Sequence, residues 1–233
     1  MAKLPFLCII TPIFNQCLPS LKILISELRT QTEQDFIHIM ISNGPSNDII
    51  KYLRDIQVEP NKFVYDELPQ EPTDNVKQLL SNVGKRRNYC LKKYNTDRFL
   101  FIDADDKILS NEYFEVLKET DDEENEIGHH FSIIITNVKN IDGTILPVHP
   151  ICFGRIDICN YTFTNYTAKK YDYPSDYSIS YNLGNDYRFY EQLKDEHQIF
   201  IDFLSIQKNG NSTYKNITKL LDEQSADPNR NFK

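Results

Sequence analysis

The sequence predicts an α/β fold in which a mostly parallel central sheet is flanked by helices. Short apolar runs of strand length alternate with segments whose apolar residues recur at helical spacing. The runs at 6–11 and 36–41 enclose one such segment, which is the pattern of a right-handed parallel crossover. A later run at 99–102 ends on three carboxylates. Because parallel strands deliver their chemistry at their carboxyl ends, we expect a functional site there.

Apolar periodicity and turn residues define the elements of the first half. In chain order we expect a strand over 6–11, a helix through 21–28, a strand over 36–41, a helix over 48–53, a short strand over 62–65, a loop over 69–72, a helix through 76–91 and the strand over 99–102.

The second half has a less regular pattern. We expect a helix over 112–117, a solvated acidic loop over 121–126, a strand over 131–138, a turn-rich segment over 141–181 with strand-like pieces near Ile151 and Tyr161, a helix over 186–193, a strand over 198–206, a helix over 214–221 and a disordered polar tail over 221–233. No repeat or low-complexity linker separates the two halves, so we expect one domain made of 1–106 and 107–220.

Composition limits the class of protein. The chain has 233 residues, of which 40% are hydrophobic and 26% charged, and this fits a globular protein rather than a disordered one. A net charge of -8 disfavours non-specific binding to nucleic acid or to anionic membranes. The five cysteines form no CxxC pair, and we find no signal peptide and no apolar segment that could span a bilayer. We therefore expect reduced thiols and a cytoplasmic location.

The carboxylates after the strand over 99–102 are candidate metal ligands. Asp103 and Asp105 stand at alternate positions, so both can offer oxygens to one hard divalent cation, Mn²⁺ or Mg²⁺. An Asp-rich turn without function is the alternative, because Asp bonds its own backbone in turns. An EF-hand does not fit, since Ile108 and Phe114 occupy its sixth and twelfth positions. The common glycine-rich nucleotide motifs, GxGxxG and GxxxxGK[ST], are also missing.

A basic stretch, residues 84–91, lies on the helix that leads to the aspartate-tipped strand. A guanidinium of this stretch could stack on a base or bind a diphosphate as a fork. The alternative is a solvated basic helix face.

These motifs, in this order, resemble glycosyltransferase family 2, whose catalytic domain has the nucleotide-diphospho-sugar transferase fold of GT-A type. The resemblance covers about 4–217 and rests on residues 11–15 after the first strand, 41–46 after the second, 84–91, 103–106, 184–188 and the closing stretch 199–212. It implies a Rossmann-like, mostly parallel sheet with a small antiparallel element on the acceptor side. It also implies that 1–106 binds the nucleotide sugar and that 107–220 holds the acceptor and the catalytic base.

The resemblance implies roles for individual residues. Those that border the nucleobase and ribose are Thr11, Pro12, Phe14 and Asn43, with Arg87 packing near the base. Asp105 is the implied ligand of Mn²⁺ or Mg²⁺, Asp103 contacts the ribose or the metal, and Asp106 supports them. Asp186 is the implied general base.

The implied reaction is a metal-dependent, inverting transfer of a sugar from a nucleotide-diphosphate sugar, with UDP favoured, to a hydroxyl of a glycan, lipid-linked or protein acceptor. Loops in 141–181 are expected to bind the acceptor. The sequence departs from the family pattern in three places: Asn43 replaces an acid, Asn185 replaces a Glu, and 208–212 lacks a His.

Three other functions are compatible with parts of the sequence. An inactive nucleotide-sugar- or carbohydrate-binding protein would explain the departures at Asn43 and Asn185. A sugar nucleotidyltransferase ranks lower, because residues 11–15 contain no glycine. A glycoside hydrolase would need a pair of carboxylates set apart from the nucleotide motifs, and we find none.

Overall fold

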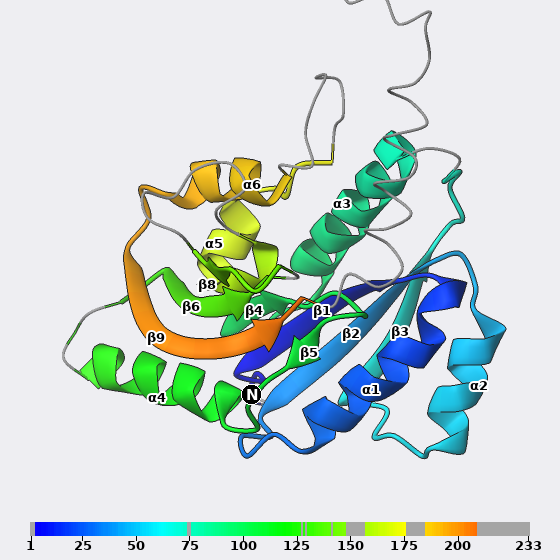
Figure 1. The fold of residues 1–233 in the computed structure, drawn as a ribbon, viewed down its shortest axis with the longest axis horizontal. Helices are drawn as coiled ribbons and strands as arrows, with labels where there is room; N and C mark the ends of the chain where they lie inside the picture. Colours follow the sequence, from blue (N-terminus) through cyan, green and yellow to red (C-terminus); the bar gives the residue numbers. More distant parts are fainter. Residues whose placement is uncertain are drawn as a thin grey trace, which may run out of the picture.

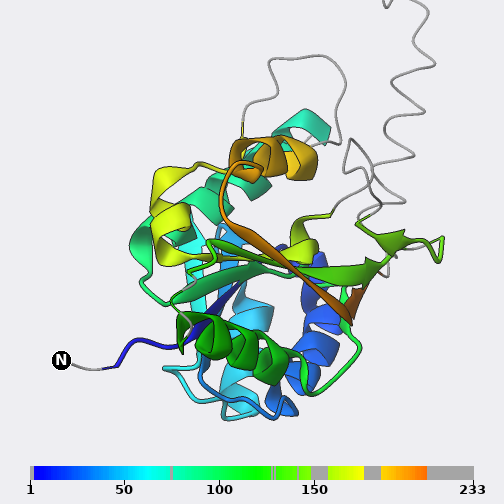
Figure 2. The ribbon, with the colours of Figure 1, turned by 90° about the vertical axis from the view of Figure 1, so that its left-hand side faces the viewer.

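The computed structural model describes residues 3–73, 76–126, 128, 130–140, 142–147, 157–175 and 185–208. Within these ranges, three layers build the fold: a central sheet with α1, α2 and α4 on one face and α3, α5 and α6 on the other (Figures 1 and 2). None of the helices in these ranges is long and apolar enough to cross a membrane.

Four parallel strands form the first half of the sheet, in the order β3-β2-β1-β4. They are β1 (Leu7–Ile13), β2 (Phe36–Asn43), β3 (Phe63–Leu68) and β4 (Arg98–Phe101). Every residue of β1 is buried, as expected for a central strand covered on both faces. The predicted parallel crossover is confirmed, with Leu7 of β1 opposite Phe36 of β2 and Arg98 of β4.

The helices of the first half begin and end close to the predicted bounds. They are α1 (Leu18–Arg29), which follows the short η1 (Asn15–Cys17), α2 (Asn47–Asp55) and α3 (Val76–Lys93). In α1 the predicted apolar face, Leu21, Leu24, Ile25 and Leu28, is buried against the sheet.

In the described part of the second half, five further strands extend the sheet. They are β5 (Lys107–Ile108), β6 (Ile133–Lys139), β7 (Ile145–Leu146), β8 (Tyr161–Thr164) and β9 (Gln198–Gln207). The sheet continues from β4 through antiparallel β8 to β6, β9 and β5, with β7 paired to β6. The predicted antiparallel element is thus confirmed.

Strand β9 crosses the molecule as a long curved band (Figure 1). Its last residues pair with β5, Gln207 opposite Lys107 and Ile206 opposite Ile108. Because β5 begins directly after the aspartates that follow β4, this pairing brings the residue after β9 to those aspartates.

The remaining elements are η2 (Ile158–Asn160) and the helices α4 (Tyr113–Glu126), α5 (Asn165–Lys170) and α6 (Asn185–Leu193). α6 confirms the predicted helix over 186–193, whereas α5 was not expected. The solvated loop predicted over 121–126 is wrong, because α4 continues through this acidic run. Its first turns bury Tyr113, Phe114 and Leu117, and Asp121 pairs with a buried arginine.

Some expectations fall on residues that the structure does not describe. These are the strand-like piece near Ile151, the helix over 214–221 and the tail over 221–233. Among the described residues, Cys8, Cys90 and Cys159 are buried free thiols and Cys17 is a half-buried one, whereas Cys152 lies outside the described residues.

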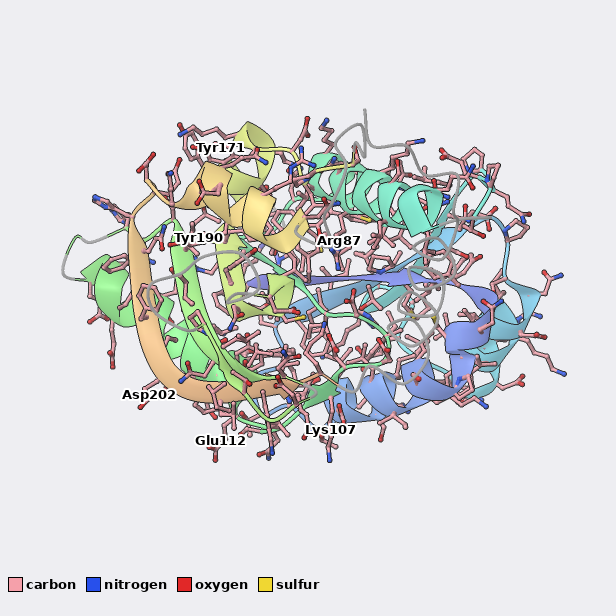
Figure 3. All side chains as sticks on the ribbon, turned by 45° about the horizontal axis from the view of Figure 1, so that its top comes forward. Arg87, Lys107, Glu112, Tyr171, Tyr190 and Asp202 are labelled. Atoms are coloured by element: carbon pink, nitrogen blue, oxygen red, sulfur yellow. The ribbon has the colours of Figure 1, made fainter. Side chains whose placement is uncertain are left out.

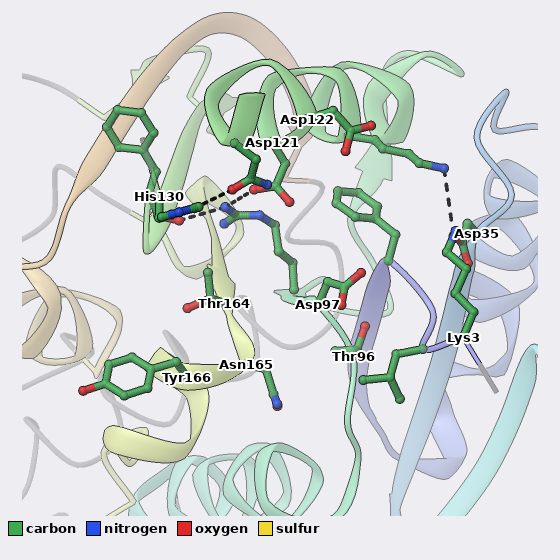
Figure 4. Close-up of a pocket in the computed structure, with 16 residues that line it drawn as sticks. Lys3, Asp35, Thr96, Asp97, Asp121, Asp122, His130, Thr164, Asn165 and Tyr166 are labelled. Carbon is green, nitrogen blue, oxygen red and sulfur yellow. Dashed lines mark hydrogen bonds and ion pairs between the residues drawn. The ribbon is translucent and has the colours of Figure 1, made fainter. Parts of the chain in front are cut away.

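Arg98 anchors the amino-terminal edge of the sheet to α4. Its side chain is 2% exposed, and Nη2 donates to Asp121 Oδ1 at 2.5 Å and to the Phe131 carbonyl at 2.8 Å. Arg98 and Asp121 line a cavity of about 490 Å³, and Asp97 and Tyr166 also line it (Figure 4). A buried guanidinium needs its counter-ion, because an uncompensated charge in the interior is costly.

Asp121→Asn removes this counter-ion, so we expect it to lower the free energy of unfolding by about 3 kcal/mol. The neighbouring exposed residue provides the control, since Asp122→Asn is expected to stay within about 0.5 kcal/mol of the parent. Urea unfolding of both variants measures the difference. Equal stability of the two would contradict the anchoring role of the Arg98 pair.

Candidate active site

Three carboxylates follow β4 in a closed turn. The Asp106 amide donates to the Asp103 carbonyl at 3.0 Å, and Asp106 Oδ2 accepts from the Asp103 amide at 3.2 Å. Asp106 is 1% exposed at its side chain, whereas Asp103 and Asp105 are partly exposed. Asp106 therefore holds the turn together, and its two neighbours face the edge of the sheet.

Arg87 of α3 binds the first of these acids. Its Nη2 donates to Asp103 Oδ1 at 2.8 Å, and its guanidinium lies 5.0 Å from the ring centre of Phe101 and 4.7 Å from that of Tyr173. The side chain is 4% exposed and lies where α3 and α6 approach the sheet (Figure 3). For Arg87 the alternative of a solvated basic face is therefore wrong. Lys85, by contrast, does lie on a solvated face, and its exposed ammonium pairs with Glu71.

A second cation, Lys208, reaches the acids from the end of β9. Its Nζ lies 2.8 Å from Asp106 Oδ2, 3.3 Å from Asp103 Oδ2 and 3.4 Å from Asp157 Oδ1. The thiol of Cys159 also donates to Asp106 Oδ2 at 3.2 Å. Lys208 thus joins the loop after β4 to the segment that precedes β8.

The surroundings shift the pKa values of these groups in different directions. Burial raises the pKa of Asp106 to about 7, against the opposing effect of Lys208. Burial also acts to raise the pKa of Asp103, but the charges of Lys208 and Arg87 outweigh it and hold that pKa below its ordinary value. At Asp105, burial and then the charge of Asp103 raise the pKa. Burial acts to lower the pKa of Lys208, but Asp106 and Asp157 keep it well above its usual range.

The cluster has an excess of negative charge. When all are ionised, the four carboxylates of Asp103, Asp105, Asp106 and Asp157 face the two cations Arg87 and Lys208. Among the described residues, no side chain forms a hydrogen bond or ion pair with the Asp105 carboxylate. The arrangement fits one divalent cation at Asp105, which would neutralise the excess. A group of three metal-ligating side chains is not found in the described part of the chain.

The residues expected around the base and ribose lie at the same sheet edge, at the ends of β1 and β2. Thr11 is buried, with its hydroxyl 2.9 Å from His38 Nε2, and Pro12 is buried in β1, while Phe14 is half-buried. Asn43 Nδ2 donates to the Glu71 carbonyl at 3.0 Å, and its Oδ1 accepts from the Glu71 amide at 2.9 Å. The Thr11 hydroxyl and the Asn43 amide thus make hydrogen bonds to other parts of the protein at this sheet edge.

Segment 173–175 ties α6 to α3. Asn88 of α3 donates to the Tyr173 carbonyl at 2.8 Å and accepts from the Tyr173 amide at 2.6 Å. Asn185, the first residue of α6, donates to the Pro174 carbonyl at 2.9 Å. A Cβ at Gly84 would lie 2.7 Å from that carbonyl oxygen, so only glycine permits this approach.

This packing places the backbone of Asp186, the second residue of α6, on the same side of the sheet as Arg87. The direction of its side chain lies outside the described part of the structure. Gly184 of the same motif, and 209–212 of the closing stretch, are also outside it.

Sequence reasoning did not assign Lys208, Asp157 or Tyr173 to the site. Lys208 belongs to the closing stretch that resembles the family, but the sequence indicated only that residues 208–212 contain no His. The available signal was the position of Lys208 just after the predicted strand over 198–206.

Several solved structures share this fold. TarS 1–349 from S. aureus in complex with UDP gives a TM-score of 0.64 at 15% identity, over 87% of this chain and 60% of that one. The same protein in complex with UDP-GlcNAc gives 0.63 at 13%, over 93% and 64%. The mannosyltransferase PcManGT from Pyrobaculum calidifontis, in complex with GDP-Man and Mn²⁺, gives 0.59 at 8%, over 91% and 59%.

The fold is therefore GT-A-like, as predicted. This chain spans 59% to 64% of the length of these three structures. No protein-family model matches the sequence, and no curated protein does so either.

Gly84→Ala tests the close packing of α3 against segment 173–175. Alanine in a helix is normally better than glycine by about 1 kcal/mol. Here its Cβ would meet backbone atoms at 2.7 and 2.9 Å, so we expect a net loss of about 1–3 kcal/mol in urea unfolding.

Lys85→Ala, at the next position of the helix, removes an exposed ion pair and is the control, with an expected change within about 1 kcal/mol. A Gly84→Ala protein that is more stable than the parent would show that the packing is looser than described.

Proposed function

We propose that this chain is a metal-dependent, inverting glycosyltransferase of the family 2 type. It would transfer a sugar from a nucleotide-diphosphate sugar, with a UDP-sugar favoured, to a hydroxyl of a glycan, lipid-linked or protein acceptor. The observation that carries the proposal is the excess of negative charge at the end of β4, with Asp105 uncommitted in the described structure. The GT-A-like fold supports it, because solved structures of this fold hold UDP, UDP-GlcNAc, or GDP-Man with Mn²⁺.

In this proposal Asp105 holds Mn²⁺ or Mg²⁺ against the diphosphate. A divalent ion there would supply Lewis-acid stabilisation of the charge that develops on the leaving phosphate. Asp103 was expected to contact the ribose or the metal. Because each of its oxygens already accepts from a cation, we assign it to the ribose side. Asp106 keeps the turn in place through Lys208 and the Asp103 amide.

The donor half, 1–106, would orient the nucleotide. Thr11, Pro12, Phe14 and Asn43, at the ends of β1 and β2, would border the base and ribose. Arg87 acts by fixing Asp103, and the Phe101 and Tyr173 rings keep its guanidinium in place. Positioning of this kind lowers the activation free energy of transfer, because the reacting groups are already oriented when the substrates are bound.

The acceptor half, 107–220, would supply the base. Asp186 stands in the first turn of α6, where the helix dipole favours the ionised carboxylate. An ionised Asp186 would take the proton from the acceptor hydroxyl as its oxygen attacks the anomeric carbon from the face opposite the diphosphate. The bond to the leaving diphosphate breaks in the same step, so the configuration inverts.

A binding protein without turnover is the second candidate. It is favoured by one observation: Asn43 and Asn185, where the family has acids, both use their amides to hold backbone carbonyls of neighbouring segments. Stabilisation by UDP and Mn²⁺, without release of UDP from any nucleotide sugar, would favour this candidate. A panel of nucleotide sugars with Mn²⁺, read for thermal stabilisation and nucleotide release together, separates the two.

Asp105→Ala is expected to abolish the Mn²⁺-dependent part of UDP binding, because it removes the uncommitted carboxylate. Calorimetry with and without Mn²⁺ measures this, and Asp55→Ala on the exposed side of α2 is the control. Unchanged Mn²⁺-dependent binding by the Asp105 variant would exclude Asp105 as the ligand.

Asp186→Asn is expected to keep donor affinity and to lose about a hundredfold or more in transfer rate, the usual contribution of a general base. Asp195→Asn, at an exposed position after α6, is the control. Near-parental turnover by the Asp186 variant would show that another group is the base.

A further inference from the structure

Lys208 is a cation of the closing stretch to which the resemblance assigns no role. Its backbone amide donates to the Lys139 carbonyl at 2.8 Å, which fixes the chain beside β6. Its side chain is 14% exposed, and Nζ lies within 3.4 Å of carboxylate oxygens from three residues: Asp103, Asp106 and Asp157. An ammonium held by three carboxylates competes with any nearby metal ion for their oxygens.

These contacts decide which oxygens can serve a metal. Asp103 accepts from Arg87 at Oδ1 and from Lys208 at Oδ2. Asp106 accepts at Oδ2 from Lys208, from the Cys159 thiol and from the Asp103 amide, and its side chain is 1% exposed. An ammonium and a divalent cation compete for the same carboxylate oxygens, and their charges repel each other.

We propose that Lys208 is a positioning residue that withholds Asp103 and Asp106 from the metal, so that Asp105 is the one carboxylate of the described cluster that the ion contacts. This inference rests on the proposed function and deepens it. With one protein carboxylate the ion has most of its coordination positions left for other oxygens, those of water and of the diphosphate.

A consequence is strong coupling between metal and nucleotide. The metal alone binds weakly, because the described residues offer it one partly exposed carboxylate. The nucleotide alone meets a cluster with an excess of negative charge. Each ligand therefore raises the affinity for the other by the same factor, as linkage requires.

The experiment measures Mn²⁺ affinity without nucleotide, by calorimetry at pH 8, for the parent chain, Lys208→Met and Lys208→Arg. Lys208→Met removes a positive charge and frees oxygens of Asp103 and Asp106, so we expect Mn²⁺ to bind at least about tenfold more tightly. Lys208→Arg keeps the charge and should bind Mn²⁺ like the parent. UDP should raise Mn²⁺ affinity less in Lys208→Met than in the parent.

Asp103→Asn adds a test that does not depend on how well the Met variant folds. In the parent background it should lower nucleotide-free Mn²⁺ affinity by less than about tenfold, because Asp103 acts there through its charge and not as a ligand. Combined with Lys208→Met, it should cancel part of the gain.

Two results overturn the inference: unchanged or weaker Mn²⁺ binding by folded Lys208→Met, or a tenfold loss of Mn²⁺ affinity from Asp103→Asn alone. Both leave the proposed function standing if the parent chain binds UDP with Mn²⁺. A parent chain that binds no UDP at any Mn²⁺ concentration contradicts the proposed function itself, and the inference with it.

Discussion

The ammonium of Lys208 among the carboxylates of Asp103, Asp106 and Asp157 is the interaction on which the described site depends. Three acids after β4 and Asp157 from the segment before β8 repel each other, and the fold tolerates them because two cations arrive from other elements. The negative charge that these two cations leave unbalanced is available to a positively charged ligand. This balance gives the buried Asp106 a structural role, and it is the basis on which we propose a chemical role for the partly exposed Asp105.

The long path of β9 explains how this balance is built. The parallel half of the sheet supplies Asp103 at the end of β4, and α3 supplies Arg87 from the layer above. The second cation, Lys208, follows β9 and reaches the aspartates because β9 crosses the sheet and pairs with β5. The two halves of the domain thus meet at the aspartates. Asn88 and Gly84 of α3, in the same layer as Arg87, hold segment 173–175, which precedes α6 in the chain.

Much of the first half could be predicted, because its signals are local. The buried run of β1 and the apolar face of α1 depend only on neighbours in sequence. The acidic end of α4 was mistaken for a loop because Asp121 stabilises it through Arg98, which no local pattern reveals. Lys208 was missed for the same reason: its partners lie about a hundred residues earlier in the chain. The hydrogen bonds that buried Thr11 and half-buried Asn43 make to protein groups likewise depend on contacts between strands and loops.

The central claim, that the tip of β4 receives the diphosphate of a sugar nucleotide through a cation, is tested most directly by a crystal structure with UDP and Mn²⁺. Anomalous scattering near the manganese absorption edge locates the ion independently of the protein. The account predicts a manganese peak shared by Asp105 and the diphosphate, with the nucleoside at the ends of β1 and β2. Manganese away from Asp105, or UDP bound in the cavity beside Arg98 at the other edge of the sheet, would contradict it.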